Sequence, residues 1–255
     1  MALILNIILS TALATDVDGV VGDLSYDGSL SETATSYTVG KPVSVSHSGG
    51  NITVNCIDTD KLSARLPYSI TGSAEGPMEA AGKGILMKAS GDGKGGGVVS
   101  TKMPSKSPSV ASIDAPLTVN VPAGASAITV SQSGSGWVSV RNCSGALKIT
   151  AGSGGLFASG AYTSASLSAT GGDVKFTQDS GAVLTGSSSF SAAGGNAILQ
   201  FSSAQGGKLS AKGAQVTTQM MVSGTNETNV VSGTFGIGGP SISVSAKANV
   251  DITAP

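Results

Sequence analysis

The chain has 255 residues and a formal net charge of −1, which provides no general attraction to nucleic acid or to an anionic membrane surface. Only 11% of its residues are charged, against a usual share of about 25%, and only 4% are aromatic, so its core must be thin and built from small apolar residues. The single histidine, His47, excludes a metal site built on two histidines.

Residues 1–14, MALILNIILSTALA, are almost entirely apolar and end in an Ala-Leu-Ala triplet. This pattern predicts a signal peptide cut after Ala14, and it is shorter than the roughly 20 apolar residues that span a bilayer. The alternative is a buried first strand or helix. Residues 15–36 are acidic and turn-rich, which is typical of an N-terminal arm or cap. We therefore expect an exported protein without a membrane span, at the cell surface, in the periplasm or outside the cell.

From residue 37 onward, apolar residues alternate with small polar ones, as in residues 43–46 (VSVS) and 52–54 (ITV). A period of two residues is typical of half-buried strands. This alternation also argues against disorder, which the abundance of Gly and Ser would otherwise allow. The pattern predicts an all-β domain over residues 37–255.

Residues 71–112 depart from this alternation and are rich in Gly, Pro and Lys. We expect an irregular segment whose lysines lie on long solvated turns. The alternative is a basic patch, including Lys83, Lys88 and Lys94, that contacts an anionic surface such as a polysaccharide or lipid headgroups. The Gly-rich run at 91–97 lacks the Gly-Lys-Ser/Thr ending of a phosphate-binding loop, so it predicts no nucleotide site.

A short strand phrase returns at nearly constant spacing within residues 117–219. Its anchors are Val130, Ile149, Leu167, Phe190 and Leu209, which are 19, 18, 23 and 19 residues apart. A period of this size indicates stacked coils that cover one another's apolar faces. The sequence therefore predicts a single elongated β-solenoid (a β-helix or β-roll) of mostly parallel short strands, with about 20 residues per coil. Ser and Thr occupy its outward positions, and its ends need caps because open strand edges polymerise.

The two cysteines end two related phrases, in which His47 of the first corresponds to Gln132 of the second. Equivalent positions on adjacent coils lie about 4.8 Å apart, within the Cα separations of about 4.4–6.8 Å that a disulfide accepts. An oxidising compartment would permit the bond. Cys56 and Cys143 are therefore a candidate disulfide. The alternative is two buried free thiols that pack as small apolar side chains.

Few residues point to chemistry. His47 is interpreted as a polar turn residue that other residues could replace. Asp58 with Asp60, or Asp173 with Asp179, could act as paired carboxylates in an acid–base site, but solvated turn acids are the simpler interpretation. We predict no enzyme activity and no catalytic, cofactor-binding or metal-binding residues.

Several phrases of the second half carry a resemblance to a known family. They are residues 117–124 (LTVNVPAG), 133–140 (SGSGWVSV), 144–150 (SGALKIT) and 170–176 (TGGDVKF). Over roughly residues 37–252, the chain resembles the bacterial putative-adhesin β-solenoid domains of unknown function, akin to the head-GIN putative adhesins. The resemblance implies a location at the cell surface or envelope and a binding or structural role, and it implies no catalytic residues.

The expected function is that of a non-enzymatic surface protein whose extended face binds a polymer, such as a polysaccharide, or another envelope protein. The candidate contacts are Lys83, Lys88, Lys94 and Trp137. Trp137 would stack on a sugar ring if it is exposed and would fill a coil corner if it is buried. One alternative is a structural subunit that polymerises through the ends of the solenoid. A carbohydrate-active enzyme on the same scaffold is a third hypothesis.

Overall fold

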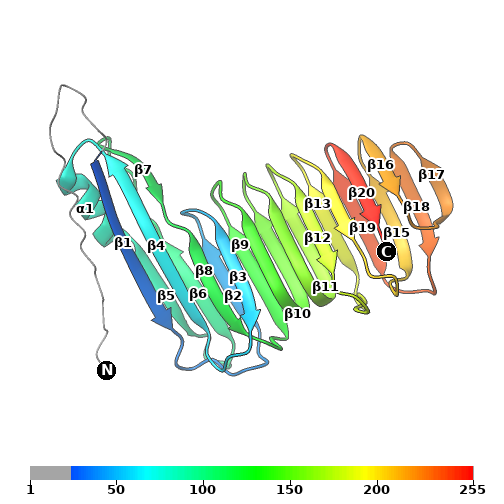
Figure 1. Ribbon diagram of the computed structural model, residues 1–255, viewed down its shortest axis with the longest axis horizontal. Helices are drawn as coiled ribbons and strands as arrows, with labels where there is room; N and C mark the ends of the chain where they lie inside the picture. The colour runs from blue at the N-terminus through cyan, green and yellow to red at the C-terminus, as the bar shows by residue number, and fades with distance from the viewer. Residues whose placement is uncertain (1–23, 255) are drawn as a thin grey trace.

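The computed structural model describes residues 24–254, most of which lie in a mixed sheet of 20 strands (Figure 1). The strands are β1 (Leu24–Thr33), β2 (Val43–His47), β3 (Ile52–Ile57), β4 (Ser63–Gly72), β5 (Leu86–Gly91), β6 (Gly97–Lys102), β7 (Val110–Asp114), β8 (Leu117–Pro122), β9 (Ala127–Gln132), β10 (Val138–Ala151), β11 (Leu156–Ala169), β12 (Val174–Gln178), β13 (Ser188–Ala192), β14 (Ala197–Gln200), β15 (Gly207–Lys212), β16 (Gln215–Thr218), β17 (Ser223–Glu227), β18 (Val230–Phe235), β19 (Ser241–Ala246) and β20 (Asn249–Thr253).

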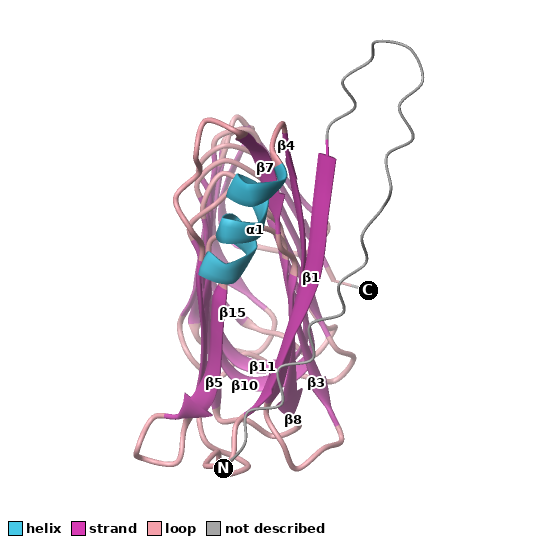
Figure 2. Ribbon diagram, turned by 90° about the vertical axis from the view of Figure 1, so that its left-hand side faces the viewer, coloured by secondary structure: helices cyan, strands magenta, loops and turns pink. Residues whose placement is uncertain are grey.

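The sheet is folded into two facing ladders of hydrogen-bonded strands (Figure 2). Ladder A has the order β5, β6, β2, β9, β10, β11, β13, β19, β15, β18, β17. Ladder B has the order β1, β4, β8, β3, β10, β11, β12, β14, β20, β16, with β7 paired to β4 beside β8. The long strands β10 and β11 belong to both ladders, because the first part of each pairs in ladder B and the last part pairs in ladder A.

The prediction of a single β-solenoid of mostly parallel strands is wrong. Antiparallel pairs form one end of both ladders, β1–β4, β4–β7, β4–β8 and β5–β6, and the other end of ladder A, β15–β18 and β17–β18. The strands also leave chain order, since β19 lies between β13 and β15, and β20 lies between β14 and β16. The chain therefore does not wind through successive coils, and the result is a mixed sheet rather than a closed solenoid.

The repeat anchors show where the prediction went wrong. Ile149 pairs with both Val130 and Leu167, and Leu167 pairs with Phe190, so the first four anchors lie side by side. Leu209 is not the next member of this row, because β19 pairs with β13 and separates it from β15. The spacing between phrases along the sequence is the same in two cases: the next strand in the chain can pair with the previous one, or a later strand can lie between them. A sequence period cannot distinguish the two arrangements.

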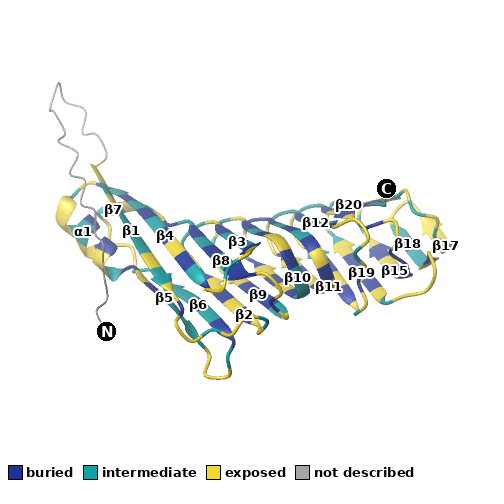
Figure 3. Cartoon of the chain, turned by 60° about the horizontal axis from the view of Figure 1, so that its bottom comes forward, coloured by how far each residue is buried: buried dark blue, intermediate teal, exposed yellow. Residues whose placement is uncertain are grey.

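The core between the ladders is built from inward residues that alternate with more exposed ones along most of the strands (Figure 3). β2 and β13 consist of buried residues separated by polar ones. The core holds an aromatic cluster formed by Tyr162, Phe176, Phe190 and Phe201, in which ring centroids in contact lie 5.0–6.1 Å apart. All four side chains are at most 1% exposed. Elsewhere the core contains Val, Ile, Leu and Ala, as the composition predicts.

Glycine-rich turns connect ladder A to ladder B and are stacked on one another. A Cβ atom at Gly154 would collide with the backbone carbonyl of Gly136, and one at Gly136 would collide with the carbonyl of Gly50. Adjacent turns therefore lie as close together as the adjacent strands that they connect, and no side chain fits between the turns at these glycines. This close stacking accounts for part of the high glycine content.

Residues 71–112 are more regular than the sequence suggests, since they contain α1 (Glu75–Gly84), β5, β6 and β7. The helix lies at the β1 end of the ladders (Figure 2), and its side chains Met78 and Ala81 are buried there. Gly82 packs so closely on Tyr26 that a side chain would not fit. Because Gly and Pro in this segment weaken helix propensity, packing against the ladder ends must stabilise the helix.

The predicted signal peptide, residues 1–14, and most of the predicted arm lie outside the described residues. The last part of the arm is not a loop, since residues 24–33 form β1 at the edge of ladder B. Within residues 24–254, no helix has the length and hydrophobicity needed to cross a membrane.

Candidate binding surface

The outward face of ladder A carries rows of hydroxyl groups, because Ser or Thr recurs at the same register position on successive strands. One row follows Lys88, Ser100, Ser46, Ser131, Thr150, Ser168, Ser191, Ser245 and Lys212. The next row follows Ser44, Thr129, Lys148, Ser166, Ser189, Ser243 and Ser210. We call the surface formed by these two rows the hydroxyl face.

The hydroxyl face has regular dimensions. Neighbouring strands lie about 4.8 Å apart, so the row from Lys88 to Lys212 extends roughly 40 Å. Its register is fixed from the opposite side, because slipping a strand by one residue would turn its Ser residues into the core. The repeating pattern of hydroxyls is thus a direct consequence of the buried Val, Ile, Leu and Phe columns.

The hydroxyl groups retain bonding capacity. Ser189 Oγ donates to Ser166 Oγ at 3.2 Å, and Ser245 Oγ donates to Ser191 Oγ at 3.4 Å. Each hydroxyl has one donor and two acceptor sites, so such a pair can still bond a ligand above the sheet. The charged residues of the two rows are lysines. The hydroxyl face therefore offers a weakly positive, hydrogen-bonding plane.

The outward face of ladder B is chemically different. The guanidinium of Arg141 lies 5.4 Å from the ring centroid of Phe157. The row that contains Phe157 begins with the hydroxyls of Thr118, Thr53 and Ser139 and continues beyond Phe157 through Lys175, Ile198 and Asp251. Hydroxyls on ladder B thus give way to aromatic, basic, aliphatic and acidic side chains, whereas one hydroxyl row of ladder A is unbroken from β6 to β19.

The structure does not gather the four predicted contact residues in one patch. Lys83 forms an ion pair with Glu79 on α1, at 2.7 Å, and the hydrogen bond to that carboxylate raises the lysine pKa. Lys94 lies in the β5–β6 turn, near the first residues of β6 and β2. Trp137 lies in the turn between β9 and β10. Lys88 alone belongs to the hydroxyl face.

Trp137 is 46% exposed, which answers the question that the sequence left open. Its backbone N–H donates to the side-chain oxygen of Asn51 at 2.8 Å. A Cβ atom at Gly155 would lie 2.6 Å from the indole ring, so the ring packs directly against the neighbouring turn. Trp137 is therefore a partly exposed side chain on the turn edge, beside the hydroxyl face rather than within it.

Cys56 and Cys143 form a disulfide, with Cα atoms 5.0 Å apart and a sequence separation of 87 residues. The bond lies where β10 bends from ladder B into ladder A, next to the paired residues Asn55 and Arg141. The residue before Cys143, Asn142, adopts a left-handed conformation with φ 57° at this bend. The disulfide thus joins β3 to β10 at the irregular point of the longest strand pair.

His47 is not the turn residue that the sequence suggests. It lies on the inward side of β2, 3% exposed, and pairs with Gln132 as the related phrases indicate. Nε2 is 2.7 Å from the carbonyl oxygen of Ala115, and Nδ1 is 2.7 Å from the hydroxyl of Thr101. Because a carbonyl only accepts, Nε2 carries the proton, and Nδ1 of the neutral ring accepts from Thr101. Burial lowers the pKa of His47, and the bond to Ala115 opposes this shift.

We expect His47 to make stability depend on pH. Because its pKa is lowered on folding, the unfolded chain binds a proton first, so stability falls as the pH drops below about 6.5, the unfolded value. His47→Gln, which copies the adjacent Gln132, should remove this dependence. Urea unfolding between pH 5 and 8 measures the effect. Equal pH profiles for both proteins above pH 5, where carboxylates remain ionised, would contradict it.

The acidic residues considered for an acid–base site are either hydrogen-bonded to a neighbouring turn or exposed to solvent. One oxygen of Asp173 accepts from the backbone N–H of Asn196 at 2.8 Å and from its side-chain amide at 3.1 Å. Asp58 and Asp60 are exposed in the turn after β3. Among residues 24–254, no group of three or more His, Cys, Asp or Glu side chains is arranged to hold a metal ion.

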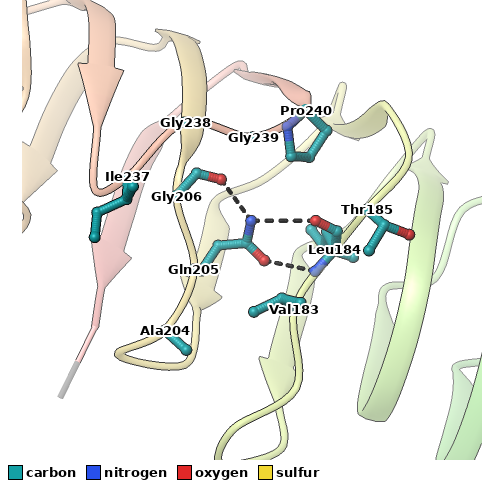
Figure 4. Close-up of a pocket in the computed structure, with 10 residues that line it drawn as sticks. All are labelled: Val183, Leu184, Thr185, Ala204, Gln205, Gly206, Ile237, Gly238, Gly239 and Pro240. Carbon is teal, nitrogen blue, oxygen red and sulfur yellow. Dashed lines mark hydrogen bonds between the residues drawn. The ribbon is translucent and has the colours of Figure 1, made fainter.

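A pocket of about 470 Å³ lies where three loops meet near the C-terminal end of the ladders (Figure 4). Gln205 forms its floor and is 6% exposed. The Gln205 amide donates to the carbonyl of Gly206 at 2.7 Å, and its oxygen accepts from the N–H of Leu184 at 2.6 Å. The polar groups of Gln205 therefore hold the loops together. No motif in the sequence predicted this pocket.

Comparison with known proteins gives a resemblance at the level of solved structures. No family model and no curated protein matches the sequence. A putative cell adhesion protein from Clostridium sporogenes has a TM-score of 0.46 and 12% identity, covering 89% of this chain and 100% of that one. A putative adhesin from Bacteroides fragilis has a TM-score of 0.40 and 12% identity, covering 89% and 97%.

A further solved structure has a different description. A putative lipid binding protein from Parabacteroides distasonis has a TM-score of 0.33 and 11% identity, covering 88% of this chain and 96% of that one. These three solved structures are bacterial proteins described as a putative cell adhesion protein, a putative adhesin and a putative lipid binding protein, and their similarity to this chain assigns none of these roles to it.

Proposed function

We propose that the protein is an exported, non-enzymatic surface protein that binds an extended polymer, such as a polysaccharide, through the hydroxyl face. The observation that supports this proposal is the unbroken register of Ser and Thr from β6 to β19. A polysaccharide repeats its own donors and acceptors along its length. A surface of hydroxyls at a constant spacing can bond such a chain at many points.

The strength of such binding depends on length. A single hydrogen bond contributes only about 0.5–1.5 kcal/mol after water is displaced. Many equivalent contacts on one chain act together, because each contact after the first is intramolecular. The lysines of the hydroxyl face, Lys88, Lys148 and Lys212, add a preference for polymers that carry some negative charge. We therefore expect weak binding of small sugars and strong binding of long chains.

Export is supported by the Cys56–Cys143 disulfide. Structural disulfides form and persist in oxidising compartments and are rare in the cytosol of most organisms. The apolar N-terminal sequence, read as a signal peptide, agrees with the same location. Surface location and polymer binding together form one proposal, because an exported protein would encounter such a polymer outside the cytoplasm.

Head-to-tail polymerisation through the ladder ends is less well supported. β5, the first strand of ladder A, already has side chains on its free edge. The N–H of Ala89 donates to the carboxylate of Glu32 at 2.6 Å, and the N–H of Gly91 donates to Ser36 Oγ at 3.1 Å. These donors are not free to pair with another strand, and side chains placed this way protect an edge from further pairing.

Retention of the protein on polysaccharides tests the proposed function. The probes are a glycan array and two insoluble polymers, peptidoglycan and cellulose. Ser168→Glu places a charged, bulky side chain in the middle of the hydroxyl face, whereas Gln200→Glu places the same group on the exposed face of ladder B. We expect Ser168→Glu to weaken binding at least about tenfold and Gln200→Glu to leave it unchanged. Equal binding by both variants, or no retention of the wild type, would contradict the proposal.

A further inference from the structure

We propose that two copies of the protein associate edge to edge through β17, forming a closed dimer in which the hydroxyl face continues from one copy into the other. The dimer contact is independent of what the hydroxyl face binds, and its effect on polymer binding rests on the proposed function. The inference comes from the one ladder A end that carries no protecting side chains among the contacts of residues 24–254.

The edge of β17 is open. In the described part of the chain β17 pairs with β18 alone, and each of its residues is exposed. The opposite end of ladder A is protected by Glu32 and Ser36. The neighbouring end of ladder B is covered by the β17–β18 turn, because the N–H of Val216 donates to the carbonyl of Thr228 at 2.7 Å. An unprotected strand edge is a template for another strand.

The hairpin geometry identifies the backbone groups that face outward. A two-residue turn joins Glu227 to Val230, which face each other. The pair that closes such a turn is hydrogen-bonded, and bonded and non-bonded pairs then alternate along the strands. The N–H and C=O groups of Gly224 and Asn226 therefore point away from β18. They form the free edge that a second copy can meet.

The sequence of β17 is complementary to itself in an antiparallel arrangement. With Thr225 opposite Thr225 of the second copy, Gly224 faces Asn226 and the two residues exchange backbone hydrogen bonds. Ser223 then faces Glu227, so no like charges oppose each other, a condition that favours pairing. A contact of this kind uses the same surface on both copies and closes after two. It predicts a dimer and not a filament.

The arrangement extends the hydroxyl face. Thr225 pairs with Ser232, which pairs with Ser210, so Thr225 is an outer member of the row that begins at Ser44. At the two-fold axis this row meets its counterpart on the second copy, on the same side of the sheet. The continuous row would then measure roughly 80 Å, about twice the length in one copy. The dimer thus gives one long polymer twice as many contacts.

An exposed apolar side chain supports the same contact. Met221, two residues before β17, is 95% exposed. Continuing the antiparallel register places Met221 against Asn229, in the hairpin turn of the second copy. Removing part of this side chain from water favours association.

Size-exclusion chromatography with light scattering on the purified full chain tests the dimer. Thr225→Lys or Thr225→Glu places like charges on the two-fold axis, and each should raise the dimer dissociation constant at least about tenfold. Mixing the two variants in equal amounts should restore the dimer, because opposite charges then meet. Ser210→Lys, in the same row but away from the edge, is the control and should leave the dimer intact. Circular dichroism verifies that each variant is folded.

Several results would overturn the inference. These are a wild type that stays monomeric at all concentrations, a Thr225→Lys variant that dimerises like the wild type, or growth beyond the dimer as concentration rises. The outcomes separate the two proposals. Polymer retention without dimerisation contradicts the dimer alone, and dimerisation without polymer retention contradicts the proposed function alone.

Discussion

Replacing both Cys56 and Cys143 by alanine is expected to lower the free energy of unfolding by about 4 kcal/mol. The bond closes a loop across a sequence separation of 87 residues, so its loss releases a large amount of conformational freedom in the unfolded chain. In the variant, β3 must also pair with β10 during folding without a covalent link between the two strands. Urea unfolding of the oxidised wild type and of the double variant measures the difference.

Reduction provides the matched control for this prediction. A thiol reductant should lower the stability of the wild type to that of the double alanine variant and should leave the variant itself unchanged. The native strand pairing of β3 and β10 should persist in the variant, since four residue pairs join these strands. A difference below about 1 kcal/mol would show that the bond does not constrain the unfolded chain as the loop length requires.

Phe176→Ala is expected to destabilise the protein by about 3–5 kcal/mol. Phe176 is 1% exposed, and its ring centroid lies 5.0 Å from that of Phe190 and 5.9 Å from that of Phe201. Removing the ring leaves a cavity between the ladders, because the neighbouring aromatic rings are fixed in a packed core and cannot move in to fill it. Thermal or urea unfolding, monitored by circular dichroism, gives the change in stability.

Phe157→Ala is the control for the core prediction. Phe157 belongs to the outward face of ladder B, where it contacts Arg141, so its loss should cost less than about 1 kcal/mol. Similar losses for Phe157→Ala and Phe176→Ala would contradict the assignment of inward and outward faces. A large loss for Phe176→Ala alone would support the two-ladder packing.

The parts of the fold that depend on local pattern could be predicted from the sequence. Alternation of apolar and polar residues identified strands because a strand turns successive side chains to opposite faces. The side-by-side positions of Val130, Ile149, Leu167 and Phe190 followed from the repeat. The candidate cysteine pair followed from the correspondence of two phrases, and the structure bonds the same two residues.

The order of the strands in the ladders could not be predicted where it departs from their order in the chain. β19 and β20 enter between strands that precede them in the chain, and their alternating sequences resemble those of the strands they displace. Helix α1 has Gly and Pro at positions that weaken a helix, so tertiary packing decides its formation. His47 was paired correctly with Gln132, but its burial depends on Thr101 and Ala115, which are distant in sequence.

The candidate surface was predicted only in outline. The outward positions of Ser and Thr were visible in the repeat, but the continuity of the rows required the register of β2, β6 and β19, which lie outside the repeat. Of the four predicted contacts, Lys88 belongs to the hydroxyl face. Lys83, Lys94 and Trp137 were selected by residue type, and residue type does not determine which edge of the ladders a side chain occupies.

The dependence of binding on ligand length tests the central claim most directly. Isothermal titration calorimetry would use soluble fragments of increasing length, prepared from the polysaccharide that retains the wild type. If the hydroxyl face binds the polymer, affinity should rise steadily with fragment length up to at least roughly 40 Å, the extent of the Lys88–Lys212 row in one copy. Affinity that is already maximal for one or two sugar units would contradict the claim and would point to a small site such as the pocket at Gln205.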